Sequence, residues 1–266
     1  MKQPRSYLFV PADRSDRFAK AIASGADTVI VDLEDAVAPA SKVAARDGLT
    51  GHLAEQAGVV LRINGRDTPW FDDDARAAAH PAFVAVMCPK TSSADDIAAL
   101  RSRCGDKPVL ALVETASGMA ASGAIAAAPG VARLVFGSID FQLDTDIEDD
   151  DALRPFRAQL VLASRVAGLP APVDGVTAAI DDQAALAGDA RRARASGFGG
   201  KLCIHPAQVA AVNAAFAPSP EQLAWARRVV AASQASQGAA VAVDGRMVDA
   251  PVFARACRLL AAGWQT

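Results

Sequence analysis

The residues best suited to chemistry in this chain are polar side chains that directly follow apolar runs. They are Asp32, Glu34, Asp35, Arg62, Asn64, Lys90, Glu114, Asp140, Asp174 and His205. Gathering ionisable groups at one apolar edge is costly unless they pair with each other, with a metal ion or with a substrate. Their types indicate a site that binds a cation and stabilises negative charge.

Glu114 and Asp140 follow two consecutive apolar runs, so their carboxylates are expected to meet at one point. Two carboxylates with open positions for water and substrate suit Mg²⁺ better than Zn²⁺ or Ca²⁺. Small residues flank both acids and leave room for an ion. Asp140 alone could equally cap the helix that follows it. Glu114 interrupts a long uncharged stretch, and we predict that the pair binds Mg²⁺.

Arg62 places a planar guanidinium at the same edge, where it could hold a carboxylate or an enolate oxygen. A structural ion pair with Asp32 or Glu34 is the alternative. We interpret the DLED segment, residues 32–35, as divided between roles: one acid binds Arg62 or Lys42, and another reaches bound water or substrate. Spacing does not decide which acid does which. Arg62, Glu34 and Lys42 are therefore our candidates for substrate binding.

Three further features have both a chemical and a structural interpretation. Lys90 could form a Schiff base, although pairing with a carboxylate is favoured. His205 could transfer protons, although a lone histidine before proline is more often a hydrogen-bonded turn residue. The segment GFGGK, residues 197–201, lacks the following helix of a phosphate loop and is interpreted as a tight turn.

The chain has no GxSxG elbow, which disfavours a serine hydrolase.

Apolar strand-like runs alternate with alanine-rich or amphipathic helical segments eight times. The strand-like runs are 7–11, 28–33, 59–63, 83–88, 109–113, 134–136, 172–176 and 201–204, and the helical segments are 14–24, 41–56, 72–80, 93–104, 117–128, 149–168, 182–196 and 207–216. Near-continuous apolar strands are typical of parallel sheets covered by helices, so the pattern predicts an α/β fold, a (β/α)8 TIM barrel. The runner-up, a doubly wound sheet, is weakened because no GxGxxG turn follows the first strand.

The barrel is expected to span residues 1–217. Residues 218–266 are expected to form an extension made of a helix at 221–232, a hairpin over VAVDGRMV and a final helix at 251–262. Because the extension has no place in an eight-unit barrel, we expect it to contact a neighbouring subunit.

The composition excludes several classes of protein. Hydrophobic residues make up 52% and the net charge is −3, which excludes a disordered chain and gives no basic footprint for nucleic acid or an anionic membrane. The four cysteines lie far apart without a CxxC pair, so neither a disulfide framework nor a zinc site is indicated. The N-terminal apolar patch is too short for a signal peptide. We expect a cytoplasmic protein.

Seven motifs occur in order along nearly the whole chain. They are SYLFVPADRSDRFAKAIASGADTVIVDLEDAV, LRIN, CPK, LVETASG, FGSIDF, GKLCIHPAQV and VDGRMVDAPV. Together they resemble the citrate lyase β-subunit-like branch of the HpcH/HpaI aldolase family. The resemblance implies a TIM barrel, usually a trimer, that binds Mg²⁺ and makes or breaks a carbon–carbon bond next to a carbonyl, often in a coenzyme A thioester.

The resemblance also implies roles for individual residues. Glu114 of LVET and Asp140 of GSID would be the metal ligands, and Arg62 of LRIN would hold the oxo-acid product and its developing negative charge. Asp35 of DLEDAV would order the pocket. Asp249 of RMVDAP would reach a neighbouring subunit's site and serve in acid/base chemistry. The metal-bearing loop reads GSIDF rather than the GxEDL form of citrate lyase subunits, a difference that bears on the substrate.

The expected reaction is a retro-Claisen or retro-aldol cleavage of a β-hydroxyacyl thioester such as malyl-, citramalyl- or citryl-CoA, releasing an oxo acid. A thioesterase or malate-synthase-like activity in the same site is a close variant. The rival from another class is a non-catalytic scaffold subunit, which the complete set of Arg62, Glu114, Asp140 and Asp249 disfavours.

Overall fold

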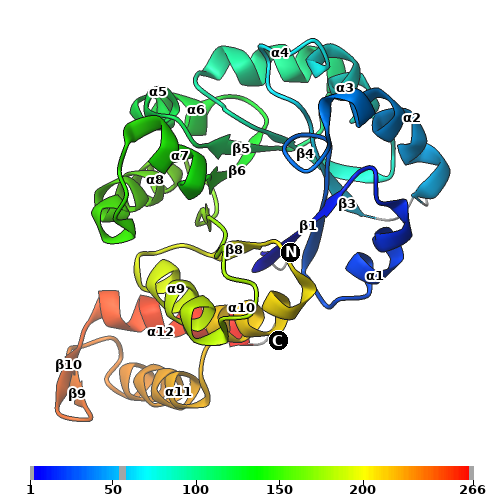
Figure 1. The fold of residues 1–266 in the computed structure, drawn as a ribbon. Coiled ribbons are helices and arrows are strands. Elements are labelled where there is room, and N and C mark those ends of the chain that lie inside the picture. The colour runs from blue at the N-terminus through cyan, green and yellow to red at the C-terminus, as the bar shows by residue number, and fades with distance from the viewer. Residues whose placement is uncertain (1–2, 54–57, 264–266) are drawn as a thin grey trace. The chain divides into compact units, whose positions relative to one another are not determined.

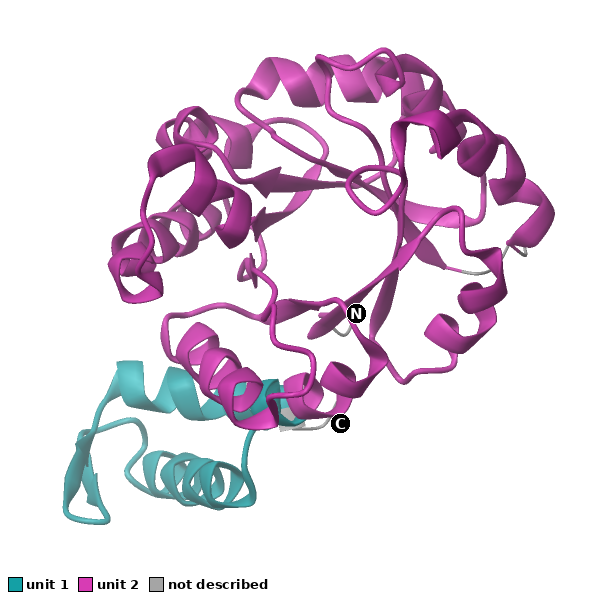
Figure 2. Cartoon of the chain, viewed as in Figure 1, with its two compact units in different colours: residues 1–2, 214–266 teal, residues 3–213 magenta. Residues whose placement is uncertain are grey.

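The structure is a computed structural model that describes residues 3–53 and 58–263. Within these ranges the chain forms two compact units, one of residues 3–213 and one that contains residues 214–263 (Figure 2). The sequence placed the boundary a few residues later, after residue 217. No helix in the described ranges is long and apolar enough to cross a membrane.

The first unit is a closed barrel of eight parallel strands in sequence order (Figure 1). The strands are β1 (Ser6–Pro11), β2 (Thr28–Asp32), β3 (Val59–Arg62), β4 (Phe83–Cys88), β5 (Val109–Val113), β6 (Val131–Phe136), β7 (Val173–Asp174) and β8 (Gly200–Cys203). Pairing of β1 with both β2 and β8 closes the barrel. The predicted (β/α)8 fold is confirmed.

Helices surround the barrel and connect its strands. They are α1 (Phe18–Ile22), α2 (Lys42–His52), α3 (Phe71–Ala77), α4 (Ala94–Cys104), α5 (Ala116–Ala120), α6 (Ser122–Ala127), α7 (Ser138–Thr145), α8 (Arg154–Val166), α9 (Gln183–Ala195) and α10 (Val209–Phe216). Two departures from the sequence prediction matter for the site. The helix expected at 117–128 is divided into α5 and α6, and the unpredicted α7 begins directly after β6.

Alternating side chains of the strands fill the barrel interior. Members of this buried layer are Tyr7, Ile30, Val60, Met87, Leu110, Leu112, Val135, Val173 and Leu202. Side chains two positions apart in a strand point to the same face, so the next inward position after an apolar residue lies above the core. Asp32 follows Ile30 in this alternation, Arg62 follows Val60 and Glu114 follows Leu112. The pairing of β2 with β3 then sets Asp32 beside Arg62.

The second unit is the predicted helix–hairpin–helix. It contains α11 (Pro220–Ala235), β9 (Val241–Val243), β10 (Arg246–Val248) and α12 (Ala250–Gly263). Asp244 and Gly245 form the hairpin turn with φ angles of 51° and 73°, as a two-residue turn with two positive φ values requires. Ala226, Val229, Val248 and Ala256 form a small buried core of its own.

Candidate active site

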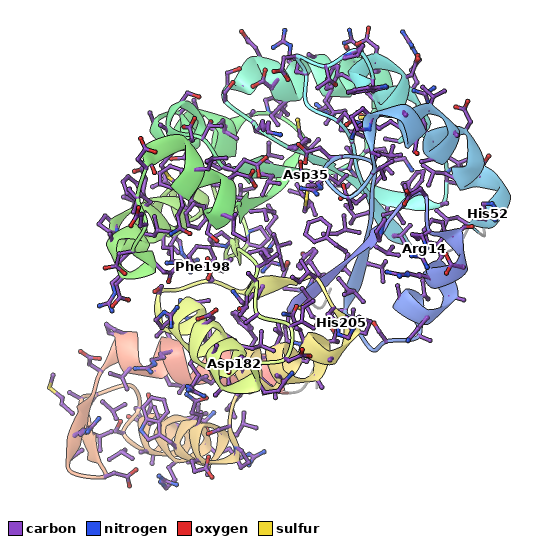
Figure 3. The ribbon with its side chains drawn as sticks, viewed as in Figure 1. Arg14, Asp35, His52, Asp182, Phe198 and His205 are labelled. Atoms are coloured by element: carbon purple, nitrogen blue, oxygen red, sulfur yellow. The ribbon has the colours of Figure 1, made fainter. Side chains whose placement is uncertain are left out.

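A cavity of about 460 Å³ lies at the carboxyl ends of the barrel strands, the usual position of the active site in this fold. Asp32, Asp35, Arg62, Glu114 and Asp140 line it, together with an apolar wall that includes Phe9, Leu112, Ile139, Val176 and Ile204. Figure 3 shows Asp35 inside the ring formed by the helices. The barrel therefore brings together charged residues that are as many as 108 positions apart in the sequence, from Asp32 to Asp140.

Arg62 is buried and held rigidly. Its Nε and Nη2 donate to the two carboxylate oxygens of Asp32, both at 2.7 Å, and its guanidinium lies 4.7 Å from the centre of the Phe9 ring. Burial alone would lower the pKa of Arg62, but the charge and hydrogen bonds of Asp32, with the charges of Glu34 and Asp35, raise it above its ordinary value. Arg62 thus forms the structural ion pair and still lines the cavity as a permanent positive charge.

The acids after β2 divide between roles. Glu34 is buried, and its Oε1 accepts a 2.7 Å hydrogen bond from Nζ of Lys90. Its Oε2 lies 2.9 Å from Nη1 of Arg62 but accepts no hydrogen bond from any described group. Burial raises the pKa of Glu34, while Arg62 and Lys90 oppose the rise. Asp35 is 55% exposed and accepts a 3.3 Å hydrogen bond from Nη1 of Arg62.

Lys42, expected to bind substrate, supports the loop after β2 instead. Its Nζ is buried and donates to the backbone carbonyls of Leu33 at 2.9 Å and Glu34 at 2.7 Å. The ammonium also lies 5.3 Å from the centre of the Trp70 ring. Lys42 is not part of the cavity lining, because its Nζ donates to these two backbone carbonyls of the loop. Spacing placed Lys42 near the acids but did not indicate this direction.

Glu114 follows β5, Asp140 lies in the helix that follows the neighbouring β6, and both line the cavity. Glu114 is 2% exposed, and its Oε1 accepts a 2.7 Å hydrogen bond from the backbone N–H of Lys90. Burial, followed by the negative charges of Glu34 and Asp140, raises the pKa of Glu114 to about 8. Asp140 lies in the first turn of α7, whose N-cap is Gly137, so Asp140 is not the cap of that helix.

The surroundings of this carboxylate pair fit a divalent cation. Burial is the largest cause of the raised pKa of Glu114, and the negative charges of Glu34 and Asp140 add to it, so a positive ion in this place would be stabilised. Gly137 lies so close to the Glu114 carboxylate that a Cβ there would overlap Oε2. Three or more His, Cys, Asp or Glu side chains do not cluster as a metal site in residues 3–53 and 58–263. Two carboxylates with room for water and substrate are a donor set that suits Mg²⁺.

The other candidate residues take structural positions. Lys90 pairs with Glu34, and although burial lowers its pKa, that ion pair raises it overall, opposite to what a Schiff-base nucleophile needs. His205 accepts the N–H of Ala207 through Nδ1 at 3.2 Å, as a turn residue does (Figure 3). Asp249 lies in the second unit, where Oδ1 accepts the N–H of Val252 at 3.2 Å at the start of α12. Its role in a neighbouring subunit stays a prediction.

Two contributors were missed from the sequence. Phe9 stacks against Arg62, and the left-handed backbone at Lys90, with φ of 48°, turns the N–H that meets Glu114. The inward position of Phe9 could have been predicted, because alternation in β1 puts it on the same face as Tyr7. Nothing in the sequence indicates the second, because lysine rarely adopts positive φ.

Fold and site together define a TIM-barrel protein with a carboxylate pair beside a fixed arginine at its mouth. The chain belongs to the HpcH/HpaI aldolase/citrate lyase family, whose model matches residues 5–206. The expectations of this family and of a lyase-type enzyme are confirmed at that level.

Individual relatives cover nearly the whole chain. A citrate lyase subunit beta-like protein of Mycobacterium tuberculosis is 42% identical over 262 residues, covering 96% of this chain and 93% of that protein. A (3S)-malyl-CoA thioesterase of Cereibacter sphaeroides is 38% identical over 257 residues, covering 92% and 89%. The crystal structure of M. tuberculosis CitE with magnesium, acetoacetate and coenzyme A superposes with a TM-score of 0.88 at 40% identity, covering 98% of each chain.

Proposed function

We propose that this protein is a Mg²⁺-dependent carbon–carbon lyase that cleaves a β-hydroxyacyl-CoA thioester, such as malyl-, citramalyl- or citryl-CoA, and releases an oxo acid. The observation that carries the proposal is the position of Glu114 and Asp140 in one cavity with Arg62. Magnesium and coenzyme A in the related CitE structure, and a malyl-CoA thioester as substrate in the name of another relative, support the same chemistry.

Glu114 and Asp140 would hold Mg²⁺, which when bound supplies Lewis-acid polarisation of the oxygens of the oxo-acid half of the substrate. Arg62 uses three of its five N–H donors on Asp32 and Asp35 within the described structure, so two remain for a substrate carboxylate or carbonyl oxygen. Because two hydrogen bonds to Asp32 hold the guanidinium in place, Arg62 does not need to move as negative charge develops in the substrate.

Cleavage requires a base and an acid. The base takes the proton of the β-hydroxyl group, the carbon–carbon bond breaks, and its electron pair moves to the carbon next to the thioester carbonyl. An acid then returns a proton to that carbon, giving the shorter acyl-CoA. We assign this acid/base role to Asp249 of a neighbouring subunit. Asp35 orders the pocket. Glu34, whose buried Oε2 has no hydrogen-bond partner among the described groups, is our candidate to accept a hydrogen bond from a bound water or a substrate hydroxyl.

Such a role for Asp249 requires an oligomer, and we propose a cytoplasmic homotrimer in which the extension, residues 218–266, contacts the next subunit. The extension has its own small core and carries an apolar groove of about 400 Å³. Trp225, Val252 and Leu259 line that groove beside Met247, which is 69% exposed. An apolar surface on so small a unit supports a protein contact.

A second candidate is hydrolysis of the thioester in the same cavity, which the (3S)-malyl-CoA thioesterase relative favours. A malate-synthase-like condensation is the lyase reaction run in reverse and followed by that hydrolysis. These activities differ from the lyase in their products: a thioesterase releases a hydroxy acid and free coenzyme A, whereas the lyase releases an oxo acid and a shorter acyl-CoA.

The test is a mass-spectrometric assay of the purified protein with a panel of hydroxyacyl-CoA thioesters, in Mg²⁺ and in EDTA. We expect an oxo acid and a shorter acyl-CoA to form only with Mg²⁺, and Glu114→Gln to lose the reaction. Free coenzyme A with an intact hydroxy acid would identify the thioesterase instead. Absence of both turnover and Mg²⁺ binding would refute the proposal and favour a scaffold subunit.

A further inference from the structure

Lys90 contacts two acids of the site through two different parts of itself. Its backbone N–H donates to Oε1 of Glu114, and its side-chain Nζ donates to Oε1 of Glu34, both at 2.7 Å. Glu34 follows β2, Lys90 follows β4 and Glu114 follows β5. One residue therefore joins the acid cluster after β2 to the carboxylate that we assign to the cation.

The backbone conformation that makes the first contact is unusual and firmly held. Lys90 has a φ of 48°, in the left-handed region that lysine seldom occupies. The next residue, Thr91, donates its N–H to the carbonyl of Leu112 at 3.1 Å. The carbonyl of Thr91 is packed against Gly118, where a Cβ would overlap it. Neighbours thus fix the conformation that turns the Lys90 N–H towards Glu114, a form of local strain found at functional sites.

The ammonium of Lys90 acts on a different partner. Glu34 lies between Lys90 and Arg62. Among the described groups, its carboxylate accepts a hydrogen bond only from Lys90, because its approach to Nη1 of Arg62 lacks hydrogen-bond geometry. Without the ammonium, Glu34 would retain Arg62 as its cation and would turn to accept a hydrogen bond from Nη1. That bond would remove a donor that we assign to the substrate.

We propose that Lys90 is a positioning residue with two separable actions, an inference that rests on the proposed lyase function. Its backbone N–H fixes one oxygen of Glu114 and leaves the other, beside Gly137, for the cation. Its ammonium holds Glu34 and so keeps an N–H donor of Arg62 available to the substrate.

Three variants separate the two actions. Lys90→Gly keeps the N–H and adopts positive φ freely but lacks the ammonium, whereas Lys90→Arg keeps a cation. Lys90→Val lacks the ammonium and, being β-branched, strongly disfavours positive φ. Gln237→Gly is the matched control, because Gln237 has a φ of 54° and lies exposed in the second unit. Thermal melts establish that each variant is folded.

We expect Lys90→Gly to bind Mg²⁺ within about threefold of the wild type by calorimetry. Its KM should rise about 10- to 100-fold, the effect of losing a hydrogen bond to a charged group, with a smaller change in kcat. Lys90→Arg should restore most of the KM. Lys90→Val should bind Mg²⁺ about 10- to 100-fold more weakly, as expected when a ligand loses its orienting partner. Gln237→Gly should change neither quantity.

Each action has its own refutation. Equal Mg²⁺ affinity in Lys90→Val and Lys90→Gly overturns the backbone action, and a wild-type KM in Lys90→Gly, or no rescue by Lys90→Arg, overturns the ammonium action. Metal-free crystal structures give an independent readout: Glu114 keeps its orientation in Lys90→Gly and turns away in Lys90→Val, while Glu34 bonds to Arg62 in both. Failure of the wild type to bind Mg²⁺ would refute the proposed function, and these structures would still decide the inference.

Discussion

Replacing Arg62 by alanine tests the charge at the centre of the proposed site. The change removes two hydrogen bonds of 2.7 Å from Asp32, which is 1% exposed. Asp32 keeps the N–H groups of Glu34 at 2.9 Å and Ala36 at 3.1 Å, so its buried charge is not left without donors. Removing one partner of a buried ion pair costs about 3–5 kcal/mol. Because these two donors remain, we expect the free energy of unfolding to fall by about 3 kcal/mol, the lower end of that range.

That loss lowers the melting temperature by about 6–12 °C at about 2–4 °C per kcal/mol for a chain of this size. The fall in the reaction rate should be larger than a loss of folded protein alone would cause. Loss of a fixed group that stabilises developing negative charge costs about 10²- to 10³-fold in rate. Steady-state kinetics at 15 °C, where the variant is folded, measure kcat/KM with saturating Mg²⁺.

Arg62→Lys is the matched control. Lysine keeps the positive charge but lacks the planar pair of donors that bind both oxygens of Asp32. We expect intermediate stability and a kcat/KM that still falls at least about tenfold, as for one lost hydrogen bond to a charged group. Turnover by Arg62→Ala within a few-fold of the wild type would refute the catalytic role and leave only the structural ion pair.

Three further predictions address the cation, the pH dependence of stability and the assembly. Gly137→Ala forces a Cβ against the carboxylate of Glu114 and should weaken Mg²⁺ binding at least about tenfold by calorimetry. Burial raises the pKa of Asp96, but hydrogen bonds from Arg66 and from the residues at the start of α4 lower it below its ordinary value overall. The ionised Asp96 carboxylate therefore stabilises the folded protein above about pH 4, and this stabilisation is lost as the pH falls further. The cost of Asp96→Asn in urea unfolding, about 1 kcal/mol at pH 6, should therefore shrink at pH 3; a pH-independent cost would contradict this. If Asp249 acts across an interface as we propose, a mixture of Arg62→Ala and Asp249→Ala subunits should recover activity that neither variant has alone; a mixture as inactive as its parents would exclude this action of Asp249.

The barrel could be predicted because apolar strand-like runs alternate with helical segments eight times, and the charged mouth could be predicted because its residues directly follow those runs. Glu114 and Arg62 each continue the inward face of an apolar strand, so their location required only the strand assignment. A strand was predicted at 172–176, but β7 is only two residues long, and α7, which starts one residue after β6 ends, was not predicted. Neither element is long enough to show a periodic pattern of its own.

The roles of the lysines depended on directions that spacing does not contain. Lys42 and Lys90 are both near the acids after β2, but only Lys90 bonds to a carboxylate there. Lys42 instead satisfies two buried carbonyls, a demand created by the path of the loop. The positions of the two lysines after their strands predict that they lie near these acids. The partner that each lysine binds depends on which buried acceptors lack a backbone hydrogen bond, and the sequence does not show this.

The balance of charge at the mouth is the strongest physical argument for a divalent cation there. Among the described side chains of this region we count five carboxylates and three cations. The carboxylates are those of Asp32, Glu34, Asp35, Glu114 and Asp140, and the cations are Arg62, Lys90 and Lys42, of which Lys42 lies outside the cavity lining but interacts electrostatically with the acids after β2. The excess is two negative charges. Burial, followed by the negative charges of Glu34 and Asp140, raises the pKa of Glu114 to about 8. A doubly charged ion between Glu114 and Asp140 would match the excess and allow both carboxylates to ionise, while Arg62 stays committed to Asp32 and keeps its remaining donors for a substrate anion.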